Sequence, residues 1–199
     1  TGQVLVSGED INRKSQKELR ELRASKIGMV FQHMALLPHR SVLDNVAFAL
    51  ELRGIDKILR RQTAQDTLKT VQLDGWEDRF PDELSGGMQQ RVGLARAVAA
   101  DPDILLMDEP FSALDPLIRR QLQDEFLDLS EKLKKTTVFI THDLGVVARI
   151  ADRVAVMYAG SFVETGTALE VFEKPIHPYT QGLMACIPVP GTVTSGQRL

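Results

Sequence analysis

Residues 104–110 have the sequence Ile104-Leu105-Leu106-Met107-Asp108-Glu109-Pro110, four apolar residues followed by two acids and a proline. Four consecutive apolar residues are typical of a strand buried on both faces, as in a parallel sheet. Ligands of open α/β sheets bind beyond the carboxyl ends of the strands, so Asp108 and Glu109 fall where a site is expected. A carboxylate there suits Mg²⁺, and a second one can act as general base on a water. The alternative is a strand end that carries charge only because it reaches solvent.

A second run of the same kind lies downstream, where Thr137–Ile140 form an apolar strand pattern and His142 follows. A neutral histidine at a strand end can hydrogen-bond a terminal phosphate or an attacking water, although a lone one is more often structural. Upstream, Gln32 follows another apolar run, Ile27–Phe31. A role for Gln32 in the site is favoured only if the strand before it lies beside the other two strands; otherwise Gln32 is a surface residue.

Strand and helix patterns alternate along the chain, which favours an α/β layered domain. Ser41 is placed to begin a helix, and another helix is predicted over residues 57–73, ended by Gly75. Residues 41–97 are thus predicted to be almost wholly helical, a subdomain inserted between strands. Ser15 is placed to cap a short helix, with Glu18 as its capping-box partner. The remaining predicted elements are helices at 116–134, from 144, at 169–172 and at 179–185, and strands at 4–6, 154–157 and 162–163.

Composition excludes several classes. The 199 residues are 43% hydrophobic and 26% charged, ordinary values for a globular protein. The net charge of -3 gives no reason to expect nucleic acid as a partner. Cys186, the single cysteine, excludes an internal disulfide and fits a reducing compartment. No apolar run approaches the ~18 residues that a membrane-spanning helix needs, so any membrane association must pass through a partner protein or a surface contact.

The stretch Glu83–Ala97 has the sequence ELSGGMQQRVGLARA, in which a serine and two glycines precede a helical pattern. A serine hydroxyl, exposed backbone N–H groups and a helix N-terminus together form an anion site. The alternative is a flexible loop that caps a helix, with Arg91 and Arg96 on the solvent face. The phosphate-binding pattern G-x-x-x-x-G-K-[ST], expected ahead of the acid-bearing strand, does not occur between Thr1 and Leu199.

The order of these motifs resembles the ATPase subunit of an ABC transporter over essentially the whole chain. The resemblance rests on Gln32, on Leu84–Arg91 (LSGGMQQR), on ILLMDEP, on Ser112–Asp115 (SALD) and on His142. It implies a P-loop NTPase-like α/β fold with an inserted helical subdomain. It also implies roles in catalysis and metal binding, with Asp108 as the Walker B acid that binds the metal, Glu109 as catalytic base and His142 as switch histidine. Gln32 would be the Q-loop residue near Mg²⁺, and Asp115 would be the D-loop acid. The implied nucleotide contacts are Gln32, Asp115, Ser85, Gly86, Gly87 and Gln89.

In this family the LSGG loop covers the γ-phosphate of ATP held by the opposite subunit. The resemblance therefore implies ATP and Mg²⁺ as cofactors and a second ATPase subunit as partner. It further implies transmembrane permease subunits, an indirect substrate-binding protein, and a place on the cytoplasmic face of the membrane. A soluble ABC ATPase of the DNA-repair or translation type is the alternative without a permease.

The two halves of the chain resemble different importers. Residues up to about 140 are similar to glycine betaine/proline (quaternary amine) uptake ATPases. The C-terminal part, with Val171–Pro188 (VFEKPIHPYTQGLMACIP), is similar to dipeptide and oligopeptide importer ATPases. Because the helical subdomain docks on the permease in this family, the compatible-solute interpretation is preferred.

The expected organisation is an α/β core over residues 1–32 and 99–165, a helical signature subdomain over 33–98, and a C-terminal helical extension over 166–199. The Walker A loop, its strand and its helix are expected to lie ahead of Thr1, so that the chain is a fragment truncated at its N-terminus. Such a fragment is expected to bind ATP weakly, to be unable to hydrolyse it alone, and to expose sheet surface.

Overall fold

The computed structural model describes residues 2–32, 34–112 and 114–186. It divides into two compact units, residues 1–140 and residues 141–199, which we describe separately. These units reflect contacts within the structure, whereas the domain boundaries predicted at residues 32, 98 and 165 came from the family resemblance. Those boundaries stay predictions. The predicted extension over 166–199 lies partly outside the described residues, as does Ala113 of the SALD motif.

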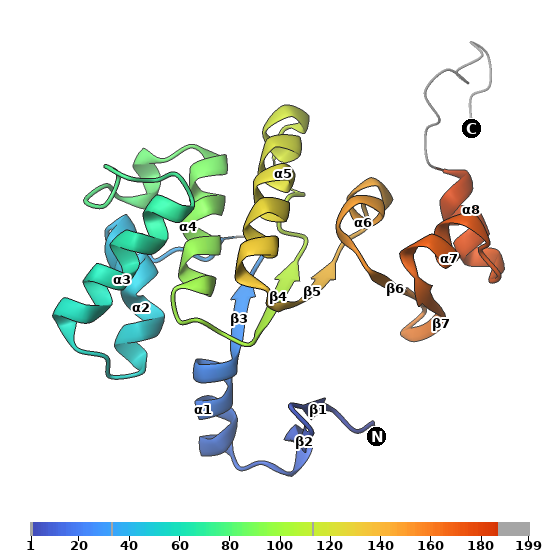
Figure 1. The fold of residues 1–199 in the computed structure, drawn as a ribbon, viewed down its shortest axis with the longest axis horizontal. Helices are drawn as coiled ribbons and strands as arrows, with labels where there is room; N and C mark the ends of the chain where they lie inside the picture. Colours follow the sequence, from blue (N-terminus) through green and yellow to red (C-terminus); the bar gives the residue numbers. More distant parts are fainter. Residues whose placement is uncertain (1, 33, 113, 187–199) are drawn as a thin grey trace. The chain divides into compact units, whose positions relative to one another are not determined.

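A three-stranded parallel sheet forms the centre of the first unit (Figure 1). Its strands are β3 (Ile27–Val30), β4 (Ile104–Asp108) and β5 (Thr136–Ile140), in the order β3-β4-β5. Val30 is paired with Met107, and Asp108 with Ile140. The prediction of three strands in an α/β fold is therefore confirmed, and the strand carrying Gln32 does lie beside the strand carrying the acids.

Helices cover one face of this sheet. Gly28, Val30, Leu105 and Met107 are buried on that face beneath α4 (Gly86–Val98) and α5 (Pro116–Leu133). An added Cβ at Gly28 would lie 2.5 Å from the Ala97 carbonyl oxygen of α4, so β3 and α4 approach as closely as backbone allows. Phe126 of α5 and Phe139 of β5 have ring centroids 6.2 Å apart, and both rings also contact Phe111.

The opposite face of the sheet carries exposed apolar side chains. Met29 and Phe31 are 38% and 41% exposed, and Val138 and Ile140 of β5 are 48% and 57% exposed. These residues alternate with the buried ones along each strand, as the period of two requires. The prediction of exposed sheet surface is thus confirmed for the described residues.

Helices α2 (Val42–Leu52), α3 (Lys57–Thr70) and α4 form the helical group seen beside the sheet in Figure 1. Ser41 caps α2 through its side chain, as predicted. The predicted end of α3 is wrong: the helix stops at Thr70, and Gln72 already has φ +60, so the chain turns before Gly75. The buried core of the group consists mainly of Val42, Leu43, Val46, Ala64, Leu68, Leu73, Val92 and Ala95.

At the N-terminus, β1 (Leu5–Val6) pairs antiparallel with β2 (Glu9–Asp10). Ser7 and Gly8 join them with φ values of 52° and 81°, the left-handed geometry of a tight hairpin turn. A short 3₁₀ helix, η1 (Ile11–Arg13), leads to α1 (Gln16–Lys26). A second 3₁₀ helix, η2 (Pro81–Glu83), directly precedes the LSGG motif. Ser15 and Glu18 form a capping box at the start of α1.

The loop before α2 is organised by one buried side chain. Asn45 is 0% exposed; its Oδ1 accepts a hydrogen bond from the Leu37 N–H at 2.8 Å. Its Nδ2 donates at 3.0 Å to the carbonyl oxygens of Leu37, Arg40 and Ser41. Both the oxygen and the amino group of the buried amide are hydrogen-bonded, which ties the loop that follows Gln32 to the helical group.

Replacing Asn45 by Ala is expected to lower the free energy of unfolding by about 2–4 kcal/mol, because it leaves several buried backbone groups unpaired. Urea unfolding followed by the fluorescence of Trp76, the single tryptophan, reports on this unit. The matched control is Asn12→Ala at an exposed position, with an expected change of about 0.5 kcal/mol or less. Equal destabilisation by the two variants would contradict the assignment.

The second unit contains α6 (Leu144–Ile150), the antiparallel pair β6 (Arg153–Tyr158) and β7 (Ser161–Thr167), α7 (Ala168–Glu173) and α8 (Pro178–Ala185). Its strands and helices match the predicted ones in order. The Glu164 carboxylate accepts from the backbone N–H groups of Ile176 and His177 at 2.9 and 3.0 Å, which anchors the segment before α8. Within the described residues of the whole chain, none of the helices has the length and apolarity to cross a membrane.

Candidate nucleotide-binding site

The carboxyl edge of the sheet carries three of the predicted site residues. Gln32 lies two residues beyond the end of β3 and is exposed. Asp108 is the last residue of β4 and Glu109 follows it; both are partly buried. Because β3 and β4 are parallel neighbours, the structure brings Gln32 and the acid pair to the same edge, where ligands of such sheets bind.

Glu109 has an unusual backbone conformation. Its φ is +46°, in the left-handed region that a non-glycine residue seldom adopts. Its N–H donates to the Ile140 carbonyl at 2.9 Å, and its own carbonyl accepts from the Ser112 N–H at 3.2 Å and the Ser112 hydroxyl at 2.9 Å. Such strain persists only where the surroundings enforce it, and it is found most often at functional sites.

Asp115 begins α5. Its Oδ1 accepts hydrogen bonds from the N–H groups of Leu117 and Ile118, both at 3.1 Å, and Pro116 occupies the first helical position. The preceding turn is held by Arg119, which donates to the Leu114 carbonyl at 3.0 Å. Asp115 is therefore an exposed N-cap whose position is fixed by its own helix.

Ser85 begins α4 in the same way, with its Oγ accepting from the Met88 N–H at 3.4 Å. Ser85 and Gly86 are exposed, while Gly87 is buried. An added Cβ at Gly87 would lie 2.9 Å from Cγ2 of Ile118 in α5. Gly87 thus allows α4 to pack closely on α5. This packing places the N-terminal turns of the two helices side by side.

Gln89 faces the loop that precedes the signature serine. Its Nε2 donates to the carbonyl oxygens of Pro81 at 2.8 Å and Leu84 at 3.4 Å. In this structure the side chain stabilises the loop, which is a task that sequence reasoning did not foresee. A nucleotide contact by Gln89 stays a prediction.

The two arginines of α4 are not the solvent-facing residues that the sequence suggested as an alternative. Arg96 donates to the carbonyl oxygens of Met34 at 2.6 Å and Ala35 at 2.7 Å, and burial lowers the pKa of its guanidinium. Arg91 forms an ion pair with Glu125 of α5 at 2.7 Å. Arg96 thus holds the loop after Gln32 against the helix that begins at Ser85.

His142 belongs to the second unit, two residues after the end of β5, and it is exposed. Asp143 next to it caps α6, accepting from the N–H groups of Gly145 at 3.0 Å and Val146 at 3.3 Å. The local structure therefore fixes the chain on either side of His142, between a strand end and a helix cap. Its role as switch histidine stays a prediction.

Asp108 is the carboxylate at this edge that could serve as a ligand of Mg²⁺. Over the residues that the structure describes, no group of three or more His, Cys, Asp or Glu side chains could hold a metal. Mg²⁺ is usually bound through one or two carboxylates, together with substrate phosphates and water. Asp108, with the Gln32 amide oxygen at the same edge, fits that incomplete protein ligand set.

The first unit is a parallel α/β domain with acids at the carboxyl edge of its sheet, where ligands of such sheets bind. The sequence pattern of the ABC transporter family matches residues 1–112, more than half of the chain, and the chain belongs to this family. The pattern described as the oligopeptide/dipeptide transporter C-terminal region matches residues 163–198.

Curated relatives agree with this assignment. The glycine betaine transport ATP-binding protein OpuAA of Bacillus subtilis is 50% identical over 98% of this chain and 47% of its own length. The glycine betaine/proline betaine transport system ATP-binding protein ProV of Escherichia coli is 55% identical over 90% of this chain and 45% of its own length. The chain thus spans about half the length of these relatives.

Among solved structures, the ATP-binding cassette MJ0796, described as a dimer in a post-hydrolysis state bound to ADP and Pi, has a TM-score of 0.74. It is 32% identical, and the match covers 84% of this chain and 74% of that one. The predicted ABC ATPase fold is thereby confirmed.

Proposed function

We propose that this chain is part of an ATP-hydrolysing subunit that powers an ABC importer for glycine betaine/proline-type compatible solutes. The observation that carries the proposal is the shared edge of Gln32, Asp108 and Glu109, with Glu109 held in a strained backbone conformation. The names of relatives about 50% identical to it supply the substrate class.

The proposed chemistry is attack of water on the γ-phosphorus of ATP. Glu109 accepts a proton from the water while the water oxygen bonds to the γ-phosphorus. The bond between the γ-phosphorus and the bridging oxygen of the β-phosphate breaks, which gives ADP and phosphate. Asp108 would hold Mg²⁺, which neutralises charge on the phosphate oxygens. Gln32 would orient the metal or the water, and His142 would donate a hydrogen bond to the γ-phosphate.

Ser85, Gly86 and Gly87 would bind the γ-phosphate held by a second subunit. The exposed Ser85 hydroxyl and the N-terminus of α4 suit an anion. Asp115, on the neighbouring helix start, would contact the partner at the same interface. The nucleotide would thus be enclosed between two copies, as an importer ATPase dimer requires.

The proposed partners are transmembrane permease subunits, with a substrate-binding protein acting through them, and the proposed location is the cytoplasmic face of the membrane. A second candidate cargo, dipeptides or oligopeptides, is favoured by the family match over residues 163–198. The compatible-solute proposal draws on matches that span the helical group, where the permease would dock.

Activity tests need a phosphate-binding loop. We define the extended chain as residues 1–199 preceded by a segment, taken from an ATP-hydrolysing family member, that carries G-x-x-x-x-G-K-[ST]. The 199-residue chain alone contains no such pattern and is expected to hydrolyse ATP at least about 100-fold more slowly than the extended chain, because positioning of the phosphates is lost. Equal rates of phosphate release would contradict this expectation.

Co-expression of the extended chain with permease subunits tests the cargo. We expect a stable complex with the permease of a glycine betaine importer and ATP hydrolysis stimulated at least about threefold by glycine betaine with its binding protein. A complex formed only with a dipeptide importer's permease, stimulated by dipeptide, would favour the second candidate. Hydrolysis without association with either permease would favour a soluble ABC ATPase.

A further inference from the structure

The left-handed backbone of Glu109 needs support from neighbouring residues. Its φ is +46°, and the proline that follows it, Pro110, favours an extended conformation at the residue before it. Both effects act against the observed conformation, so contacts with other residues must hold it. Because the side chain extends from this backbone, whatever holds the backbone also sets the direction of the Glu109 carboxylate.

Two hydrogen bonds from Ser112 meet at the Glu109 carbonyl. The Ser112 hydroxyl donates at 2.9 Å, and the Ser112 N–H donates at 3.2 Å. Together they close a tight turn over Pro110 and Phe111. Any residue except proline could supply the N–H, whereas the hydroxyl bond depends on the serine.

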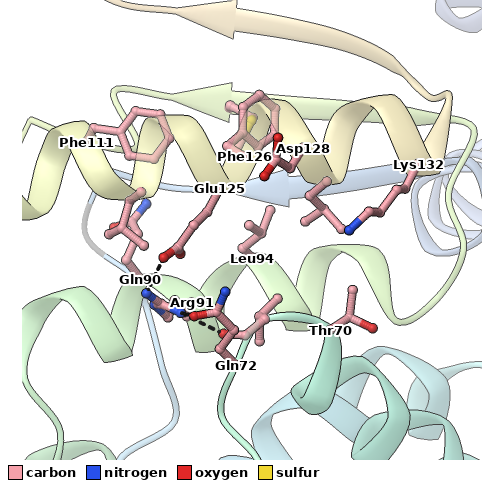
Figure 2. A pocket seen from close by; sticks show the side chains of 14 residues that line it. Thr70, Gln72, Gln90, Arg91, Leu94, Phe111, Glu125, Phe126, Asp128 and Lys132 are labelled. Carbon is pink, nitrogen blue, oxygen red and sulfur yellow. Dashed lines mark hydrogen bonds and ion pairs between the residues drawn. The ribbon is translucent and has the colours of Figure 1, made fainter.

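The rest of this turn is held by larger elements. The Glu109 N–H donates at 2.9 Å to the carbonyl of Ile140, the last residue of β5. Phe111 is buried, and its ring centroid lies 6.3 Å from that of Phe126 in α5. Both rings line the cavity between α4 and α5 that Figure 2 shows. The carbonyl of Glu109 is therefore the side of this residue that Ser112 holds.

Ser112 is in turn attached to α5. Nη2 of Arg119, in the first turns of that helix, donates to the Ser112 carbonyl at 3.3 Å and to the Leu114 carbonyl at 3.0 Å. A continuous series of hydrogen bonds thus leads from α5 through Ser112 to the proposed base. The Ser112 residue itself is exposed, and the family resemblance implied a role for Asp115 of the SALD motif but none for Ser112.

We propose that Ser112 is a positioning residue for Glu109: its hydroxyl holds the left-handed backbone of Glu109 and keeps the carboxylate directed at the attacking water. The proposal rests on the proposed role of Glu109 as base. In this role Ser112 needs no contact with the nucleotide or with the partner subunit. Loss of one hydrogen bond shifts an equilibrium about two- to tenfold, and displacement of a reacting group adds to that cost.

The test compares Ser112→Ala with Ser112→Thr in the extended chain. We expect Ser112→Ala to lower kcat for ATP hydrolysis about tenfold and to change KM less than about twofold, because the base is displaced while the phosphate contacts remain. Ser112→Thr keeps a hydroxyl and should retain most of the wild-type kcat. The matched control is Ser25→Ala in α1, where an exposed hydroxyl donates to the Glu21 carbonyl at 2.7 Å, and it should leave kcat and KM unchanged.

A second measurement shows whether Ser112 acts through Glu109. The Glu109→Gln variant is expected to accumulate an ATP-bound dimer, because it cannot cleave the nucleotide. Adding Ser112→Ala to this variant should leave the amount of dimer unchanged, since the residue through which Ser112 acts is already disabled. If Ser112 instead contacted the nucleotide or the partner subunit, the double variant would form less dimer.

Three kinetic results would overturn the proposal: an unchanged kcat in Ser112→Ala, equal losses of kcat in Ser112→Ala and Ser112→Thr, and loss of the dimer in the double variant. A largely unfolded Ser112→Ala variant, detected by Trp76 fluorescence, would also overturn it, because Ser112 would then support the fold alone. Continued ATP hydrolysis by Glu109→Gln would contradict the proposed role of Glu109 itself. With an inactive Glu109→Gln, failure of Ser112→Ala leaves the proposed function intact.

Discussion

Replacing Glu109 by Gln in the extended chain is expected to lower the rate of ATP hydrolysis by at least about 100-fold while ATP still binds. The amide keeps the size of the side chain but cannot take a proton from water. Because the nucleotide is then bound without being cleaved, an ATP-bound dimer should accumulate. Phosphate release gives the rate, and light scattering in size-exclusion chromatography gives the mass.

The matched control is Glu131→Gln, an exposed acid near the end of α5, which should hydrolyse ATP at the wild-type rate. Continued turnover in the Glu109→Gln variant would remove Glu109 from the role of base. Loss of ATP binding together with turnover would contradict the expectation that the substitution leaves binding intact.

Replacing Gly28 by Ala is expected to destabilise the first unit by about 3 kcal/mol or more. The added methyl group would lie 2.5 Å from the Ala97 carbonyl oxygen and 2.9 Å from side-chain atoms of Leu105 and Pro102. Since the nearest atom belongs to backbone, β3 and α4 must move apart. Urea unfolding followed by Trp76 fluorescence measures the change in the free energy of unfolding.

The matched control is Gly93→Ala within α4, where the nearest atom that the added methyl group would meet among the described residues is Sδ of Met34, at 3.8 Å. Alanine is the better helix former, so this variant should be as stable as wild type or slightly more stable. Equal stability of Gly28→Ala and Gly93→Ala would contradict the close packing of β3 on α4.

Much of the fold could be predicted from the sequence because its signals are local. Apolar runs of four or five residues predicted β3, β4 and β5, and Ser41 predicted the start of α2. The end of α3 was predicted wrongly because Gly75 is a strong local stop signal, whereas the chain already turns at Gln72 in a left-handed conformation. Tertiary packing of Leu73, buried in the helical core, overrides the local signal there.

The edge of the site was also predictable, because acids that follow buried parallel strands must gather there. The contacts of Arg91, Arg96 and Gln89 were not predictable, since their partners lie 5 to 62 residues away in the chain. The reason for Gly87 could not be found either, because the contact with Ile118 exists only once α4 packs on α5. The nucleotide contact of Gly87 was implied by the resemblance, and it stays a prediction beside this packing contact.

The most direct measurement of the central claim mixes two inactive variants of the extended chain, Glu109→Gln and Ser85→Arg. If Ser85 completes the site of the opposite subunit, each mixed dimer holds one site with both wild-type residues. Phosphate release should then rise from near zero to roughly a quarter of the wild-type rate. A mixture no more active than either variant alone would contradict the account.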